Sequence, residues 1–137
     1  MLQIKVPASI ERLDEVTDFV NDRLEELSCP LKAQMQIDIA IDEIFGNIAR
    51  YAYGSDIGDA VVRVESDTDS LSVVITFIDS GKPFNPLKRD DPDVTLSAEE
   101  RGIGGLGIYV VKKTMDNVEY EYKDGNNILR IKKKLSR

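Results

Sequence analysis

Residues 60–79 read AVVRVESDTDSLSVVITFID, two apolar stretches that flank a short polar one. Val, Ile, Thr and Phe are enriched in strands, and a polar connection between two such runs favours a β-hairpin. We therefore predict strands over residues 60–65 and 71–79. Helical patterns stand on both sides of this hairpin, so the helices are separated by a strand pair instead of alternating singly with strands. That order disfavours an all-parallel doubly wound sheet.

The segments around the hairpin supply the other predicted elements. Apolar residues at helical spacing predict helices from residue 9 to about 27, from 31 to 53 with Gly54 as the stop, and from about 106 to 116. Alternating patterns predict strands over residues 2–6, 118–122 and 128–135. The expected fold is a two-layer α/β (α+β) sandwich, in which a mixed, largely antiparallel sheet carries three helices on one face.

Composition favours one compact domain spanning residues 1–137, because 42% of the residues are apolar. With 25 acidic against 18 basic residues, the formal charge is −7, and we expect no direct contact with nucleic acid. No apolar run approaches the roughly 20 residues that span a bilayer, so we expect a soluble cytoplasmic protein without a membrane contact. The chain has no histidine, which leaves carboxylates, lysines or a bound metal for any catalysis.

Glu43 and Asn47 stand four residues apart on the second predicted helix, so both side chains project from one face. An Asn amide oxygen suits Mg²⁺, which takes a few oxygen ligands from protein and the rest from phosphates and water. A Glu one turn away could orient or deprotonate a nucleophile beside that metal. The same pair would also suit a simply solvated helix face.

Asp79 ends the second strand of the hairpin and is followed by Ser80 and Gly81. A carboxylate there can accept a hydrogen bond from the exocyclic amine of adenine, and Gly81 would let the backbone approach a flat base. An Asp-Ser-Gly sequence also commonly forms an ordinary turn, so this alternative stays open.

Four glycines in six residues, Gly102, Gly104, Gly105 and Gly107, lead with Ile103 and Leu106 into the third predicted helix. Their backbone N–H groups can converge on an anion at a helix N-terminus, which predicts phosphate binding. These residues also satisfy G-x-G-x-x-G, but that dinucleotide fingerprint needs a preceding buried strand. Here the preceding residues 82–101 are proline-containing, charged and without a period, and are expected to form a lid or a flexible loop.

The three constellations together resemble the GHKL superfamily of ATPases and kinases with the Bergerat nucleotide-binding fold, and within it the anti-sigma-factor serine/threonine kinases. The N box corresponds to Asp42-Glu43-x-x-x-Asn47, the adenine box to residues 79–86 and the glycine box to residues 101–107. The similarity spans residues 4–135. Each box alone is weak, and the specificity comes from their order and separation.

This resemblance implies ATP and Mg²⁺ as ligands. Asn47 would ligate Mg²⁺, Asp79 would bind the adenine amine, and a lid of about residues 82–105 would fold over the nucleotide. Glu43 is similar to the general base that activates a serine or threonine hydroxyl of the partner. The implied partners are a STAS-type anti-sigma-factor antagonist as substrate and a sigma factor, and related kinases also dimerise.

Two positions depart from the family pattern. Many relatives carry a histidine where this chain has Tyr51, and a threonine near the base where it offers Ile128.

Instead of a kinase, the chain could be a binding module in which nucleotide sets partner affinity without phosphate transfer. The catalytic domain of a histidine kinase is a third reading. Lys132, Lys133 and Lys134 are expected on a solvated edge strand.

Overall fold

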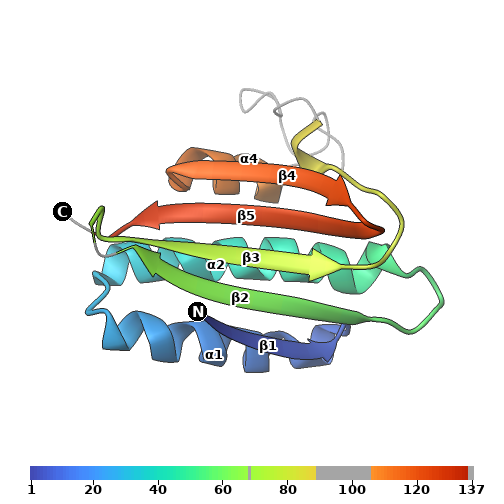
Figure 1. The fold of residues 1–137 in the computed structure, drawn as a ribbon, viewed down its shortest axis with the longest axis horizontal. Coiled ribbons are helices and arrows are strands. Elements are labelled where there is room, and N and C mark those ends of the chain that lie inside the picture. Colours follow the sequence, from blue (N-terminus) through green and yellow to red (C-terminus); the bar gives the residue numbers. More distant parts are fainter. Residues whose placement is uncertain (68, 89–105, 136–137) are drawn as a thin grey trace.

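The computed structural model describes residues 1–67, 69–88 and 106–135, which form a sheet layer and a helix layer (Figure 1). In chain order the elements are β1 (Leu2–Pro7), the 3-10 helix η1 (Ile10–Arg12), α1 (Leu13–Glu26), α2 (Leu31–Asn47), the π-helix η2 (Ile48–Ala52), β2 (Asp59–Asp67), β3 (Ser72–Asp79), the 3-10 helix η3 (Pro86–Lys88), α4 (Leu106–Thr114), β4 (Asn117–Lys123) and β5 (Asn126–Lys134).

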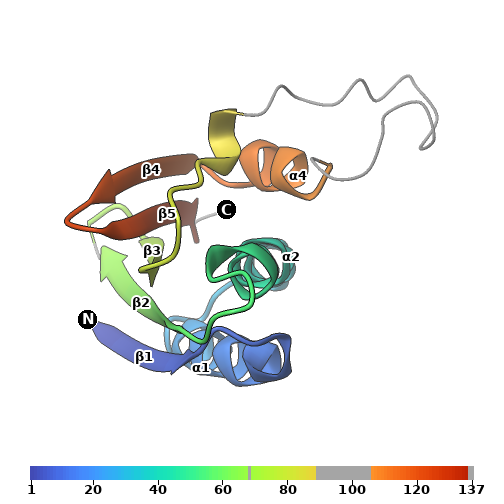
Figure 2. The ribbon, with the colours of Figure 1, turned by 90° about the vertical axis from the view of Figure 1, so that its right-hand side faces the viewer.

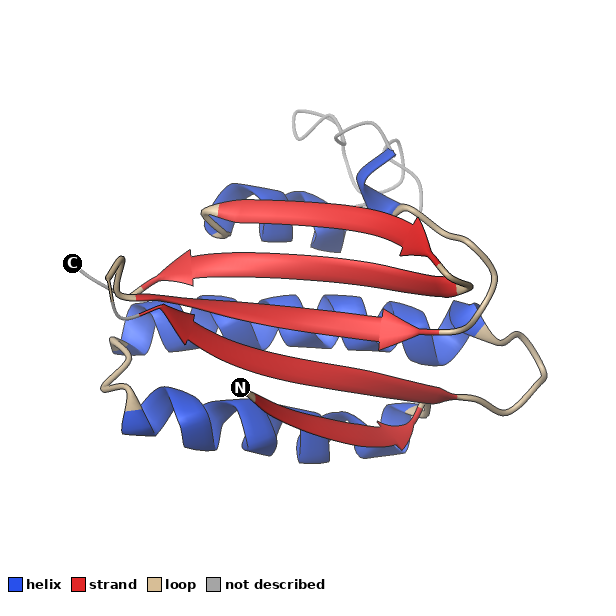
Figure 3. Cartoon of the chain, in the orientation of Figure 1, coloured by secondary structure: helices blue, strands red, loops and turns tan. Residues whose placement is uncertain are grey.

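The sheet has five strands in the order β1-β2-β3-β5-β4, and each neighbouring pair is antiparallel (Figure 3). The predicted hairpin is β2 and β3, paired from Ala60 opposite Asp79 to Asp67 opposite Ser72. The final strand β5 lies inside the sheet, between β3 and β4, so the expectation that Lys132–Lys134 form an edge strand is wrong. The chain returns from the outer strand β4 by a tight turn, which places its last strand in the interior of the sheet.

The three helices α1, α2 and α4 lie side by side on one face of the sheet, as Figure 2 shows. This confirms the expected two-layer α/β sandwich. The core between the layers joins alternate strand residues such as Val62 and Phe77 to Ile37, Ile41 and Phe45 of α2, all at most 1% exposed. Full burial of one such side chain stabilises the fold by about 1.5–3 kcal/mol. These contacts hold α2 firmly beneath the sheet, which fixes the helix that carries Glu43 and Asn47.

The end of α2 departs from a regular helix. After Asn47 the backbone widens into η2, and Gly54, with φ of 59°, follows as the predicted stop. Insertions of this kind occur often at functional sites. Among the described residues, none of the helices is both long and apolar enough to cross a membrane.

Candidate functional site

The candidate site is a pocket between the C-terminal end of α2 with η2 and the strands β3, β4 and β5. Asn47 and Tyr51 line it from the helix layer, and Asp79 and Asn127 line it from the sheet. Two of the predicted site residues, Asn47 and Asp79, therefore face one cavity although they are 32 positions apart in the chain. The free volume inside is about 50 Å³.

Asp79 ends β3 and is 6% exposed. Its Oδ1 accepts hydrogen bonds from the Gly81 N–H and from Asn127 Nδ2, each at 2.9 Å. The described residues make no hydrogen bond to its Oδ2. A carboxylate with one oxygen held and the other available is suited to accept from an amine of a bound base.

Gly81 is needed because the backbone passes close to η2. A Cβ on this residue would lie 2.1 Å from the Ala52 carbonyl oxygen, and the neighbouring Lys82 N–H donates to that oxygen at 3.0 Å. The close approach that requires glycine is therefore to η2, a contact that the sequence did not predict. It ties the turn after Asp79 to the end of α2.

Asn127 is the site residue that sequence reasoning missed. It pairs with Asp79 across the β3–β5 ladder, whereas Ile128, expected near the base, pairs with Ile78 and faces away from the helices. Neighbouring residues of a strand point to opposite faces, so an error of one position exchanges an amide for an apolar side chain. The alternation of Asn127, Leu129 and Ile131, all buried, is the signal that would have found it.

The Asn127 amide uses both its nitrogen and its oxygen. Nδ2 donates to Asp79 Oδ1 and to the Lys82 carbonyl, each at 2.9 Å, while Oδ1 accepts from the Phe84 N–H at 3.1 Å and from the Tyr120 hydroxyl. Burial raises the pKa of Tyr120, and the negative charge of Asp79 raises it further. Tyr120 therefore stays a neutral donor, and the amide orientation is set from both sides.

Glu43 and Asn47 lie together at the other end of the site. Asn47 Nδ2 donates to Glu43 Oε1 at 3.2 Å, which leaves Asn47 Oδ1 without a hydrogen bond among the described residues. A free amide oxygen of this kind fits the requirement of Mg²⁺ for hard oxygen ligands. Both residues are half-buried.

The start of α4 packs directly against Glu43. A Cβ on Gly107 would lie 2.0 Å from Glu43 Oε2, so glycine is the residue that fits between the two helices. Leu106 is the first residue of α4, whereas Gly102, Gly104 and Gly105 lie outside the described residues. The N-terminus of α4, which favours anions, therefore stands beside Glu43.

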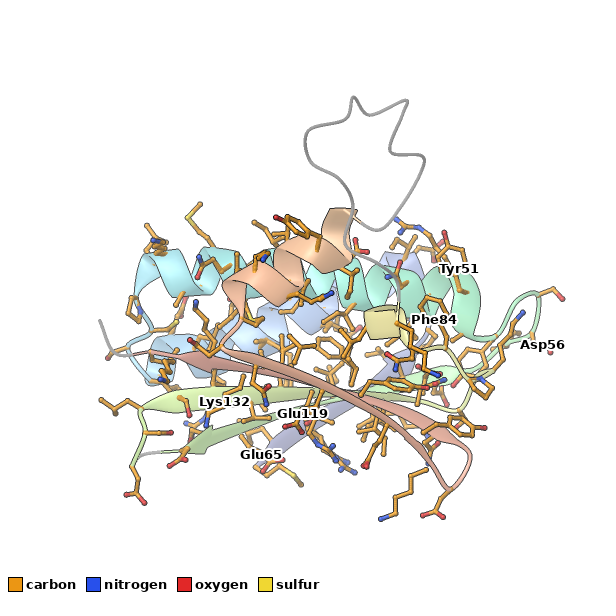
Figure 4. The ribbon with its side chains drawn as sticks, turned by 90° about the horizontal axis from the view of Figure 1, so that it is seen from above. Tyr51, Asp56, Glu65, Phe84, Glu119 and Lys132 are labelled. Carbon is orange, nitrogen blue, oxygen red and sulfur yellow. The ribbon has the colours of Figure 1, made fainter. Side chains whose placement is uncertain are left out.

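Several side chains surround the mouth of the pocket. Tyr51, in the position where histidine was expected from the resemblance, is 58% exposed and lines the pocket together with Phe84 (Figure 4). Lys82 also lines it. The Arg50 guanidinium folds back over α2, with its Nη1 3.3 Å from the place of a Cβ on Gly46. Lys82 is thus a cationic side chain in a lining that also holds the Asp79 carboxylate.

The two-layer sandwich thus has a pocket lined by the Asn47 amide from the helix layer and the Asp79 carboxylate from the sheet, and Glu43 is hydrogen-bonded to Asn47 beside it. A family model described as Histidine kinase-like ATPase domain matches residues 6–133. The chain therefore belongs to the histidine kinase-like ATPase family, and the resemblance to the GHKL superfamily and its anti-sigma-factor kinases is confirmed.

Among its relatives is a Serine-protein kinase RsbW of Bacillus cereus, 24% identical over 133 residues, a match that covers 96% of this chain and 83% of the relative. The protein of the same name from Bacillus mycoides is 24% identical over 135 residues, with the same coverage. A crystal structure of the RsbU and RsbW domains of Rv1364c from Mycobacterium tuberculosis matches with a TM-score of 0.66 at 15% identity. It covers all of this chain and 33% of that longer chain, and shows likeness of fold.

Proposed function

We propose that this chain is a cytoplasmic, ATP-dependent protein serine/threonine kinase of the anti-sigma-factor type, which phosphorylates an anti-sigma-factor antagonist, binds a sigma factor, or both. The relatives named Serine-protein kinase support this proposal. The observation that carries it is the arrangement on α2: Glu43 and Asn47 lie side by side against the start of α4, in a site whose pocket also holds Asp79.

The first half of the proposal concerns nucleotide binding. It assigns one ligand contact to each of the two side-chain oxygens, Asp79 Oδ2 and Asn47 Oδ1, that have no hydrogen bond among the described residues. Asp79 Oδ2 accepts from the adenine amine, and guanine offers no such donor at that place. Asn47 Oδ1 holds Mg²⁺, which neutralises the phosphates when bound. Backbone N–H groups of Gly102, Gly104, Gly105, Leu106 and Gly107 are assigned to the phosphates at the N-terminus of α4.

The transfer half assigns the general base to Glu43. The serine or threonine oxygen of the partner forms the new bond to the γ-phosphorus, the bond from that phosphorus to the ADP oxygen breaks, and Glu43 takes the hydroxyl proton. Asn47 Nδ2, 3.2 Å from Glu43 Oε1, holds the carboxylate in place. Positioning and charge neutralisation provide most of the rate in phosphoryl transfers, and a general base adds about 10²- to 10⁴-fold.

The nucleotide half is tested by thermal shift with Mg²⁺ and ATP, ADP or GTP. A ligand at about 100 times its Kd stabilises the folded state by roughly 2.7 kcal/mol. We expect this for ATP and ADP but not for GTP, and we expect Asp79→Asn to remove most of it. An equal response to GTP would contradict the adenine assignment.

The transfer half is tested with Glu43→Gln, which keeps the size of the side chain and its contact with Gly107. We expect normal stabilisation by ATP but a loss of about 10²- to 10⁴-fold in phosphate transfer to a cognate antagonist. If the native chain binds ATP and the antagonist without transferring phosphate, the protein is the binding module and not a kinase.

A further inference from the structure

An exposed line of apolar side chains leads along α2 to Glu43. Leu31, Met35 and Ile39, here called the apolar stripe, are 71%, 57% and 49% exposed. They follow each other at intervals of four residues, on the side of α2 opposite the buried Ile37 and Ile41. At a rise of about 1.5 Å per residue, Ile39 is roughly 6 Å and Leu31 roughly 18 Å from Glu43 along the helix axis. The stripe therefore ends about one turn from Glu43, the proposed general base.

An acidic surface lies beside this stripe. Asp14, Asp18, Asp22 and Glu25, here called the acidic row, are exposed on α1 at intervals of three or four residues. Among the described residues none of them forms an ion pair, unlike Glu15 and Glu26, which pair with arginines of the same helical segment. The helices α1 and α2 lie side by side (Figure 2), and Gln34 Nε2 donates to Asn21 Oδ1 at 3.1 Å between them. The acidic row and the stripe therefore stand on adjacent helices.

We propose that the apolar stripe and the acidic row are the docking surface for the phosphoacceptor protein, and that the acceptor meets them with an apolar patch edged by Lys and Arg. This inference rests on the proposed function, because a protein whose hydroxyl reaches Glu43 comes close to the adjoining surface of α2. The apolar side chains of the stripe supply affinity. The unpaired carboxylates select a basic rim and speed its approach.

The test uses every purified STAS-type antagonist of the source organism as a probe, titrated into the full chain with Mg²⁺ and a non-hydrolysable ATP analogue. Met35→Lys and Ile39→Lys should each weaken binding of the cognate antagonist about tenfold or more, as expected for the loss of an apolar anchor. Ile57→Lys is the control, because Ile57 is 97% exposed in the loop between η2 and β2, outside the stripe and the row, and should bind as the native chain does.

A second pair of variants tests the basic rim. Asp18→Asn with Asp22→Asn should slow association several-fold and reduce its dependence on salt, whereas Asp124→Asn in the β4–β5 turn should change neither. Any one of three results would overturn the proposal. These are native affinity in both stripe variants, an unchanged association rate after loss of the two carboxylates, and the absence of binding by every antagonist. All variants should keep the thermal stabilisation by ATP; loss of that stabilisation in the native chain, or binding without transfer, would count against the proposed function instead.

Discussion

At the scale of single residues, Asn127 fixes the inner end of the pocket through one amide group. Its nitrogen holds Asp79 Oδ1 and the Lys82 carbonyl, and its oxygen receives the Phe84 N–H and the Tyr120 hydroxyl. In the opposite amide orientation, Nδ2 would face the Phe84 N–H and the Tyr120 hydroxyl, and Oδ1 would face Asp79 Oδ1 and the Lys82 carbonyl. Donors would then meet donors and acceptors would meet acceptors. Tyr120 therefore influences the orientation of Asp79 without touching it.

Removal of the Tyr120 hydroxyl should weaken nucleotide binding. In Tyr120→Phe the Asn127 oxygen loses one of its two donors, and a net hydrogen bond is worth about 0.5–1.5 kcal/mol, so we expect ATP affinity to fall roughly 2- to 10-fold. Tyr122→Phe is the control, because Tyr122 is 47% exposed and should leave the affinity unchanged. Isothermal titration calorimetry of the two variants decides; equal affinities would remove Tyr120 from this role.

Asp38 on α2 should limit stability at neutral pH. Its Oδ1 is buried without a hydrogen-bond partner within the described part of the chain. Burial raises the pKa of this carboxyl and the charge of Asp42 raises it further, against a lowering by the hydrogen bond with Asn21. Because the pKa is higher in the folded state, folding favours the protonated form. The stabilisation from this group is present below the unfolded pKa and is lost as the pH rises through the folded pKa.

Asp38→Asn, which stays neutral at every pH, should therefore raise the Tm at neutral pH by a few degrees. The gain should shrink on acidification and vanish below a pH of about 3.9, where the native carboxyl is protonated in both states. Thermal melts across this range measure the effect, with Asp22→Asn on the exposed side of α1 as the control. A gain that is constant with pH would show that charge is not the cause.

At residue scale the sequence predicted the positions whose chemistry follows from spacing along one element. Glu43 and Asn47 were found because a spacing of four places two side chains on one face of a helix, and the hydrogen bond between them agrees with that. Asn127 was missed because the last strand is predicted to begin only at residue 128, so the alternation that includes Leu129 and Ile131 was not extended to residue 127. Its place opposite Asp79 depends on the β3–β5 register, which is set by pairing between distant strands.

At the scale of elements, the turn after β3 and the π-helix η2 act as one unit. The Ala52 carbonyl accepts the Lys82 N–H, and the Tyr53 hydroxyl accepts the Ser80 N–H at 2.8 Å while it donates to the Asp59 carbonyl at 2.6 Å. The end of the helix that carries Asn47 is thus bonded to the strand end that carries Asp79. The sequence predicted both elements and the Gly54 stop, but the π-helix has no distinct residue pattern, and this junction was not predicted.

Gly81→Ala should push the turn after β3 away from η2. Its Cβ would lie 2.1 Å from the Ala52 oxygen, so the turn has to shift, and overpacking of this kind typically costs about 1–3 kcal/mol. We expect a lower Tm together with weaker ATP binding, because Asp79 moves with the turn. Gly54→Ala is the matched control: its φ of 59° makes alanine unfavourable, but no atom lies within 4 Å of the added Cβ.

That control should lower the Tm while ATP affinity stays native. Thermal melts and calorimetric titration of both variants separate general destabilisation from displacement of the site. If Gly81→Ala also kept native ATP affinity, the junction would be structural only.

At the scale of the whole molecule, the site has two ends on different layers. Asp79 at the end of β3 belongs to the sheet, and Asn47 with Glu43 belongs to the helix layer, next to α4. The proposed function assigns the adenine of the nucleotide to the Asp79 end, and the phosphates with Mg²⁺ to the end of Asn47 and Glu43. The fold brings these ends to one pocket, and the sequence could indicate this only through the resemblance, because nothing local relates residue 47 to residue 79.

The two ends should therefore respond to different parts of the nucleotide. Adenosine has no phosphate, so Asp79→Asn should weaken adenosine and Mg·ATP by the same factor, about tenfold or more for a hydrogen bond to a charged group. Asn47→Ala should weaken ATP but not adenosine, and only when Mg²⁺ is present; EDTA should reduce ATP affinity in the native chain and have no further effect in this variant. Since the described residues show no hydrogen bond between the side chains of Asn47 and Asp79, the double variant should lose the sum of the two free energies within about 0.5 kcal/mol. Calorimetric titrations of adenosine and ATP, each with and without EDTA, measure these affinities. A loss of adenosine binding in Asn47→Ala would contradict the division of the site.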